Sequence, residues 1–75
     1  MSEINWEYLS NIPDNNPTFY VYLKTSILGY NYKEIAHMNG VAHTTVKNAF
    51  TRVMHKVGAT GQAQLVHLAH QVKIL

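Results

Sequence analysis

The clearest alternation of apolar and polar positions in the chain lies over residues 43–57. Apolar residues recur there at the spacing of one buried face of an α-helix. These positions are Val46, Phe50, Val53 and Val57. Gly58 follows directly and suits the end of a helix, because glycine adopts the left-handed conformation of a C-terminal cap at little cost. The pattern predicts a helix over 43–57 whose apolar stripe, Val46 included, lies in the core.

A shorter helix is predicted just before it, over residues 32–38. Asn31 and Glu34 have a spacing close to that of a capping box, in which two side chains bond the first free N–H groups of a helix. Gly40 then supplies the positive φ that a tight turn needs. The positions expected to face inward are Ile35 and Ala36. Two helices joined by such a turn are typical of a helix-turn-helix, which places its second helix in the DNA major groove.

The segment before Gly29 predicts a further helix, over residues 18–28. Asn16 is a suitable N-cap, and Pro17 stands at the first helical position, where its missing N–H costs nothing. A β-strand competes over residues 19–23, which have high strand propensity. The cap signals favour the helix. Its expected buried stripe is Tyr20, Leu23 and Ile27, with Phe19 beside it.

The last predicted helix covers residues 62–73 and is apolar over an unusually broad arc. Its stripe consists of Leu65, Leu68, Ala69 and Val72, widened by Ala63 and Val66. An arc of this width is typical of a helix that serves two surfaces, and we expect one to be the core and the other a partner.

The first 17 residues predict an extension with a short helix over residues 2–12. Ser2 is a possible N-cap, and Pro13 is expected to end the helix. The apolar positions of one face are Ile4, Tyr8, Leu9 and Ile12. The side chains of Trp6, Tyr8 and Ile12 either pack on the core or present a partner surface, and the small core favours packing. Residues 14–17 are rich in turn formers and predict a linker. The domain proper is therefore expected over 18–75.

Composition narrows the function. A chain of 75 residues makes one small domain, and the lack of cysteine excludes disulfides, cysteine-based zinc sites and thiol nucleophiles. No apolar run approaches the ~20 residues that span a bilayer, and the first residues lack the pattern of a secretory signal. We expect a cytoplasmic protein with no membrane association.

Catalysis and metal binding have little support in the sequence. No Ser-His-Asp set, carboxylate pair or phosphate-cradling glycine loop can be assembled, so we expect no enzyme activity and no cofactor. Among the five histidines, His67 and His70 have a spacing that can chelate a metal, but no third ligand accompanies them. We therefore expect no metal site.

Charge is divided unevenly along the chain. Glu3, Glu7 and Asp14 lie in the first 14 residues, whereas the rest carries six basic residues against Glu34 alone. A basic body attracts phosphate polyanions such as nucleic acids.

Several short motifs in register give the chain a family resemblance. They are Gly29, residues 31–36, Gly40-Val41, and residues 45–48, 56–59 and 62–66. Residues 18–70 resemble the LuxR/GerE-type DNA-binding domain on these motifs. The resemblance implies an all-α, four-helix helix-turn-helix fold, here with a short N-terminal helical extension. It also implies double-stranded DNA as the partner, bound by the third helix, in a homodimer joined through the fourth.

The implied sites follow from the predicted helices. Base contacts are expected from the outward face of the helix over 43–57, at Thr44, Lys47, Asn48 and Thr51. Phosphate contacts are expected at Arg52, His55, Lys56, Thr45 and Lys33. The dimer interface is expected at Leu65, Val66, Leu68, Ala69 and Val72.

The chain departs from the family pattern at five places. Two of them are Ala49, where the family often has a histidine, and Gln62, where an arginine often follows the final loop. Residues 18–21 read Thr-Phe-Tyr-Val where the family has a Thr/Ser-x-Arg-Glu run. Asn39 stands at a usually apolar position, and we expect Met38 to fill the space. Ala42 replaces the serine N-cap of the helix over 43–57, which costs about 1 kcal/mol of capping.

Two functional hypotheses follow. The first is a small transcriptional regulator that inserts its third helix into the major groove as a homodimer. The alternative is an interaction protein, an anti-activator that heterodimerises with a larger LuxR-type regulator and blocks its DNA binding. The altered caps and missing arginines favour this alternative. A resemblance to region four of bacterial sigma factors shares the same motif logic, but the fourth helix argues for the LuxR/GerE type.

Overall fold

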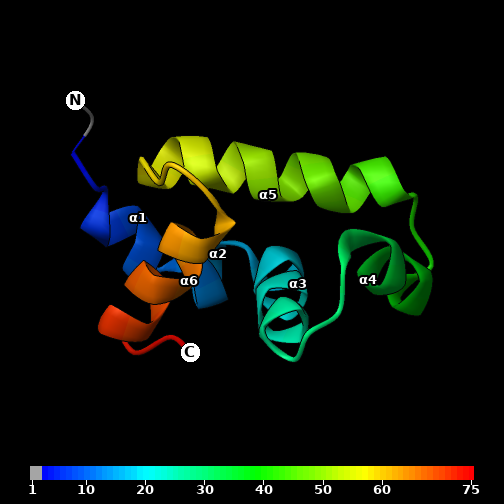
Figure 1. The fold of residues 1–75 in the computed structure, drawn as a ribbon. Helices are drawn as coiled ribbons and strands as arrows, with labels where there is room; N and C mark the ends of the chain where they lie inside the picture. The colour runs from blue at the N-terminus through cyan, green and yellow to red at the C-terminus, as the bar shows by residue number, and fades with distance from the viewer. Residues whose placement is uncertain (1–2) are drawn as a thin grey trace.

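The computed structural model describes residues 3–75 and shows six helices and no strand among them. The helices are α1 (Trp6–Ser10), α2 (Ile12–Asn15), α3 (Pro17–Ile27), α4 (Tyr32–Asn39), α5 (His43–Val57) and α6 (Gln62–Gln71). α5 is the longest and runs along one side of the molecule, with the other helices packed below it (Figure 1). The all-α prediction is confirmed. The strand alternative over residues 19–23 is wrong, because α3 covers them.

α5 has the predicted bounds, and its apolar stripe is buried. Val46, Phe50 and Val57 are fully buried and Val53 is 1% exposed. The Phe50 ring packs edge-on against Phe19, with ring centroids 4.9 Å apart, and stacks on Tyr32 at 5.0 Å. Val46 is thus a core residue, as predicted, and Phe50 joins α3 and α4 to α5.

α3 begins as predicted but buries a different face. The Asn16 side chain accepts a hydrogen bond from the Phe19 N–H at 3.2 Å, so the predicted N-cap is confirmed. The buried side chains are Phe19, Tyr22 and Leu23. The prediction was wrong for Tyr20, which is half-buried with its hydroxyl bonded to the Ile74 carbonyl, and for Ile27, which is 43% exposed. Five successive aromatic or aliphatic residues left the inward face undetermined until the neighbouring helices fixed it.

α4 has the predicted capping box. The Asn31 side chain accepts from the Glu34 N–H and the Glu34 carboxylate accepts from the Asn31 N–H, each at 2.9 Å. Gly40 ends the helix at φ 65°, as the turn requires. Ile35 and Ala36 are buried as expected.

The expectation that Met38 fills a space left by Asn39 is wrong. Met38 is 51% exposed, while the Asn39 amide donates to the Ile35 carbonyl of its own helix at 2.7 Å. The Asn39 side chain therefore finds a hydrogen-bond partner within its own helix, and Met38 remains on the surface of α4.

The first residues form two short helices in place of the predicted one. Asn5 is the N-cap of α1, and the proposed cap Ser2 lies outside the described residues. Pro13 does not end a helix but occupies the first turn of α2, where proline is tolerated, so residues 14 and 15 are helical instead of a linker. Leu9 and Ile12 are fully buried in the core shared with the other helices.

The end of α5 and the start of the chain are in backbone contact. The Asn5 N–H donates to the Val57 carbonyl at 2.8 Å. Gly58 has φ 87°, and a Cβ at that position would lie 2.8 Å from the Glu3 carbonyl oxygen. Glycine is therefore required there both for the left-handed cap and for the close approach of the leader, the N-terminal segment that precedes α3.

α6 corrects the predicted dimer interface. It ends at Gln71, two residues before the expected end, and Lys73 has a left-handed φ of 62°. Leu65, Leu68 and Ala69 lie in the monomer core, because α1 and α5 both pack on α6. They are not exposed interface residues. Only Val66 and Val72 of the expected set remain half-buried.

Candidate nucleic-acid interface

One side of α5 is polar and open to solvent. We call it the exposed face of α5, and all its members are exposed: Thr44, Thr45, Lys47, Asn48, Thr51, Arg52, His55 and Lys56. α5 contains no carboxylate. The stripe on the opposite side holds the helix in the core, so this face is presented on a rigid support. The structure brings together eight of the nine residues predicted to contact DNA.

Two of the central side chains are free to bind a ligand. Within residues 3–75, no hydrogen bond engages the side chains of Lys47 or Asn48. Thr51 differs, because its hydroxyl donates to the Lys47 carbonyl one turn earlier at 3.1 Å. An ammonium group and an amide on a major-groove helix suit guanine or phosphate and adenine, respectively.

Lys33 is the one predicted residue that the structure sets apart. It lies on α4 and lines a shallow hollow of about 410 Å³ with Tyr30, Glu34, His37 and Met38. The Glu34 carboxylate shares this hollow, so the surface around Lys33 is less cationic than the exposed face of α5.

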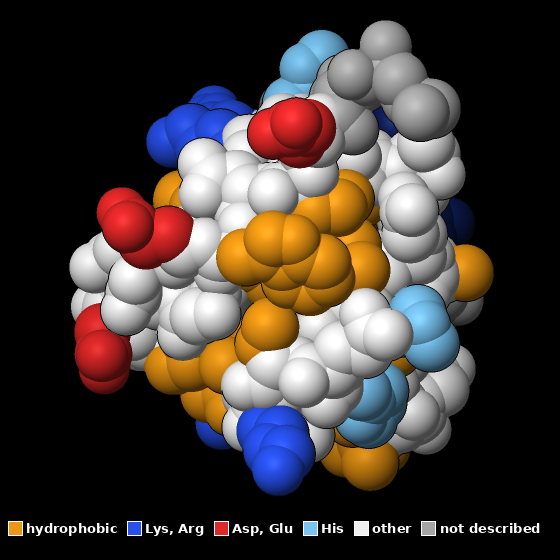
Figure 2. Space-filling model, turned by 90° about the vertical axis from the view of Figure 1, so that its left-hand side faces the viewer, with side chains coloured by type: hydrophobic (Ala, Val, Ile, Leu, Met, Phe, Trp, Pro, Cys, Tyr) orange, Lys and Arg blue, Asp and Glu red, His pale blue; other side chains and the backbone are white. Residues whose placement is uncertain are grey.

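The carboxylates of the leader lie at the end of the molecule where α5 terminates. Glu3, Glu7 and Asp14 are exposed on the leader, and Trp6 beside them is 48% exposed. Figure 2 shows this end of the molecule, where carboxylates border an apolar surface and histidines lie on the other side of it.

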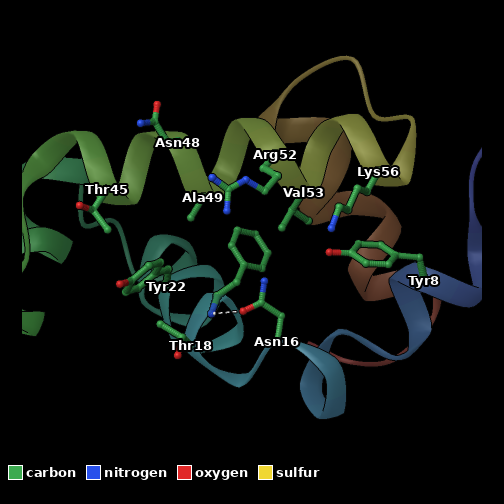
Figure 3. A pocket seen from close by; sticks show the side chains of 11 residues that line it. Tyr8, Asn16, Thr18, Tyr22, Thr45, Asn48, Ala49, Arg52, Val53 and Lys56 are labelled. Atoms are coloured by element: carbon green, nitrogen blue, oxygen red, sulfur yellow. Dashed lines mark hydrogen bonds between the residues drawn. The ribbon is translucent and has the colours of Figure 1, made fainter.

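A groove of about 420 Å³ runs between α5, the start of α3, and α1. α5 contributes Thr45, Asn48, Arg52 and Lys56, while Thr18 comes from α3 and Tyr8 from α1 (Figure 3). The Lys56 ammonium lies over the Tyr8 ring, 5.6 Å from its centroid, which is within the range of a cation–π interaction. Among the described residues that line the groove there is no carboxylate.

Tyr8 and Thr18 are groove residues that the sequence reasoning missed. The sequence analysis predicts that Tyr8 either packs on the core or presents a partner surface, with packing favoured, and it treats Thr18 only as a departure from the family pattern. No local signal could have identified them, because their proximity to Arg52 and Lys56 arises from packing between distant parts of the chain.

Away from the exposed face of α5, a side-chain hydrogen bond joins two helices. The Tyr32 hydroxyl donates to the Gln62 side-chain oxygen at 2.7 Å and so ties α4 to the start of α6. Burial raises the pKa of Tyr32 above its ordinary value. In residues 3–75 no three metal-ligating side chains gather, and no helix there has the length and apolar character to cross a membrane.

Comparison with family models, curated proteins and solved structures finds no match to this chain. The functional argument therefore depends on the exposed face of α5 and on the groove beside it.

Proposed function

We propose that this protein is a DNA-binding regulator of the LuxR/GerE helix-turn-helix type, in which α4 and α5 form the motif and α5 enters the major groove. The observation that carries the proposal is the exposed face of α5, which is cationic, free of carboxylates and mounted on a buried stripe. The fifteen residues of α5 span about 22 Å, and the major groove is wide enough to admit a helix.

The side chains divide into two roles in this proposal. Lys47 and Asn48 read base edges near the middle of the contact, with Thr44 beside them. Arg52, His55 and Lys56 lie toward the C-terminal half of α5 and contact the phosphate backbone, which fixes the register of the helix without reading sequence. Thr45 contributes to the same backbone contacts.

The dimer in this proposal cannot use the core residues of α6. A second copy would have to pack on what remains at its surface, where Val66 and Val72 are half-buried and Ala63 and His67 are exposed. Binding by one copy through α5 does not depend on that interface.

A titration of a short DNA duplex at two salt concentrations tests the proposal. Lys47→Ala should weaken binding on the order of tenfold and lower the salt slope by about one ion, because one positive charge in the groove between the two phosphate backbones is lost. Lys73→Ala is the matched control, since it removes the same charge from an exposed site outside α5. Fluorescence anisotropy measures both.

Two outcomes would refute the proposal. The first is a wild-type chain that does not bind duplex DNA at low salt. The second is an equal loss of affinity in Lys47→Ala and Lys73→Ala, which would mean that net charge and not the exposed face of α5 drives binding.

A second function is favoured by the leader. The exposed Trp6 beside Glu3 and Glu7 suits a protein partner with a basic surface, since aromatic side chains are often the anchors of interfaces. In this alternative the chain forms a heterodimer with a larger regulator and blocks it. A chain that fails to bind duplex DNA but co-elutes with such a regulator would support this alternative over the first.

A further inference from the structure

The groove between α1, α3 and α5 has the chemistry of an anion site. Two cationic side chains, Arg52 and Lys56, enter it from successive turns of α5, and Thr18 adds a hydroxyl from α3. A phosphate oxygen only accepts hydrogen bonds, so guanidinium, ammonium and hydroxyl donors suit it, and no described carboxylate in the lining opposes it. The groove also adjoins Asn48, which lies on the surface proposed to read bases.

Lys56 differs from the other cations of α5 in having a neighbour that holds it. The Tyr8 ring lies 5.6 Å from its ammonium nitrogen, and both side chains line the same groove (Figure 3). A lysine side chain free in solvent must give up much rotational freedom when it binds a ligand. A ring that already keeps the ammonium group at the groove lowers that cost, while the ammonium still has hydrogens free to donate.

The position of Tyr8 is itself fixed by the fold. Leu9, the next residue of α1, is fully buried, and the Asn5 N–H bonds the Val57 carbonyl directly after Lys56. The leader is therefore anchored to the turn of α5 that carries Lys56. A segment outside the region of family resemblance thus contributes to the surface beside α5.

We infer that this groove seats a backbone phosphate of the duplex that α5 contacts, and that Tyr8 is a positioning residue that holds Lys56 for it. The inference rests on the proposed function, because it takes the phosphate from bound DNA. It adds a role for the leader, which becomes part of the DNA interface instead of a structural appendage.

A double-mutant cycle on Tyr8 and Lys56 tests the inference by anisotropy with a short duplex over a range of salt. Tyr8→Leu removes the ring and should weaken binding about two- to fivefold, the effect of an exposed cation–π contact. Lys56→Ala should weaken it on the order of tenfold and lower the salt slope by about one ion. The double variant should bind like Lys56→Ala alone, because Tyr8 acts through Lys56.

Two further variants separate positioning from folding. Tyr8→Phe keeps the ring and should restore most of the affinity lost in Tyr8→Leu. Trp6→Leu removes an exposed aromatic side chain from the same helix outside the groove and should leave binding unchanged. Circular dichroism melting identifies any variant whose loss of binding reflects loss of fold.

The failures are distinguishable. If Lys47→Ala weakens binding but Tyr8→Leu and Lys56→Ala do not, the inference is wrong and the proposed function stands. Losses from Tyr8→Leu and Lys56→Ala that add in the double variant also overturn it, because Tyr8 would then act independently of Lys56. A wild-type chain that binds no duplex DNA would refute both the inference and the proposed function.

Discussion

The two sides of α5 differ in exposure, in charge and in their contacts with the rest of the fold. The stripe of Val46, Phe50, Val53 and Val57 is at most 1% exposed and contacts other helices of the fold. The opposite side is exposed, polar and cationic, and contacts little of the described chain except at the groove. Substitutions on the first side should therefore change the free energy of unfolding. Those on the second should change binding and leave stability almost intact.

A charged helix face alone is a weak indicator of function, because most such faces merely interact with water. Here the helix is held along its whole length by buried residues, so the backbone positions of Lys47 and Asn48 are fixed before any ligand binds. A rigid support of this kind makes a surface suitable for reading a duplex.

The largest predicted effect comes from removing the side chain at the centre of the buried stripe. Phe50→Ala should cost about 3–5 kcal/mol, because it deletes a ring packed between Phe19 and Tyr32 and leaves a cavity. A chain of 75 residues has a total stability of roughly 4–11 kcal/mol, so much of it would be lost. Urea unfolding followed by circular dichroism measures the change.

Lys47→Ala is the matched control for that experiment, since it lies on the other side of the same helix. Its free energy of unfolding should change by no more than about 0.5 kcal/mol, the usual range for a surface substitution. A Phe50→Ala protein that unfolds at the wild-type urea concentration would show that α5 is not held as the structure describes.

The sequence predicted the parts of the fold that depend on near neighbours. The bounds of α5, the Asn16 cap, the Asn31–Glu34 capping box and the Gly40 turn all depend on residues a few positions apart, and all are confirmed. The buried face of α3 was not predictable, because its apolar residues are adjacent and give no period. The neighbouring helices decided which of them face inward.

The candidate site shows the same limit. The exposed face of α5 follows from the period of its apolar stripe, so the sequence predicted it. The contact of Tyr8 with Lys56 joins residues far apart in the chain and has no local pattern. The apolar arc of α6 predicts a partner surface in part, but Leu65, Leu68 and Ala69 are buried where α1 and α5 pack on α6. Apolar content alone does not distinguish a core from an interface.

A smaller change in stability is predicted at the start of α5, where the helix lacks a side-chain cap. Ala42 has the extended backbone of an N-cap, but no side chain there accepts a hydrogen bond. Ala42→Ser should raise the free energy of unfolding by about 1 kcal/mol, because its hydroxyl can accept from a free N–H of the first turn. Thermal melting measures the gain.

Ala42→Gly is a second test of the cap, since glycine at an N-cap gives most of the gain in stability that serine gives. Duplex affinity should be unchanged in both variants, because neither alters the exposed face of α5. Increased stability with weakened binding would mean that the start of α5 must loosen when DNA is bound.

The smallest predicted effect concerns Thr51, which lies on the exposed side but uses its hydroxyl within the helix. Its bond to the Lys47 carbonyl is of the kind that slightly destabilises helices, and alanine has the higher helix propensity. Thr51→Ala should therefore raise stability by less than about 0.7 kcal/mol and weaken duplex binding less than Lys47→Ala does. Melting and anisotropy on the same samples measure both effects.

A loss of affinity as large as that of Lys47→Ala would mean that the Thr51 hydroxyl turns from its own helix to the DNA. A loss of stability would mean that the exposed side also supports the fold, and the division between the two sides of α5 would then fail.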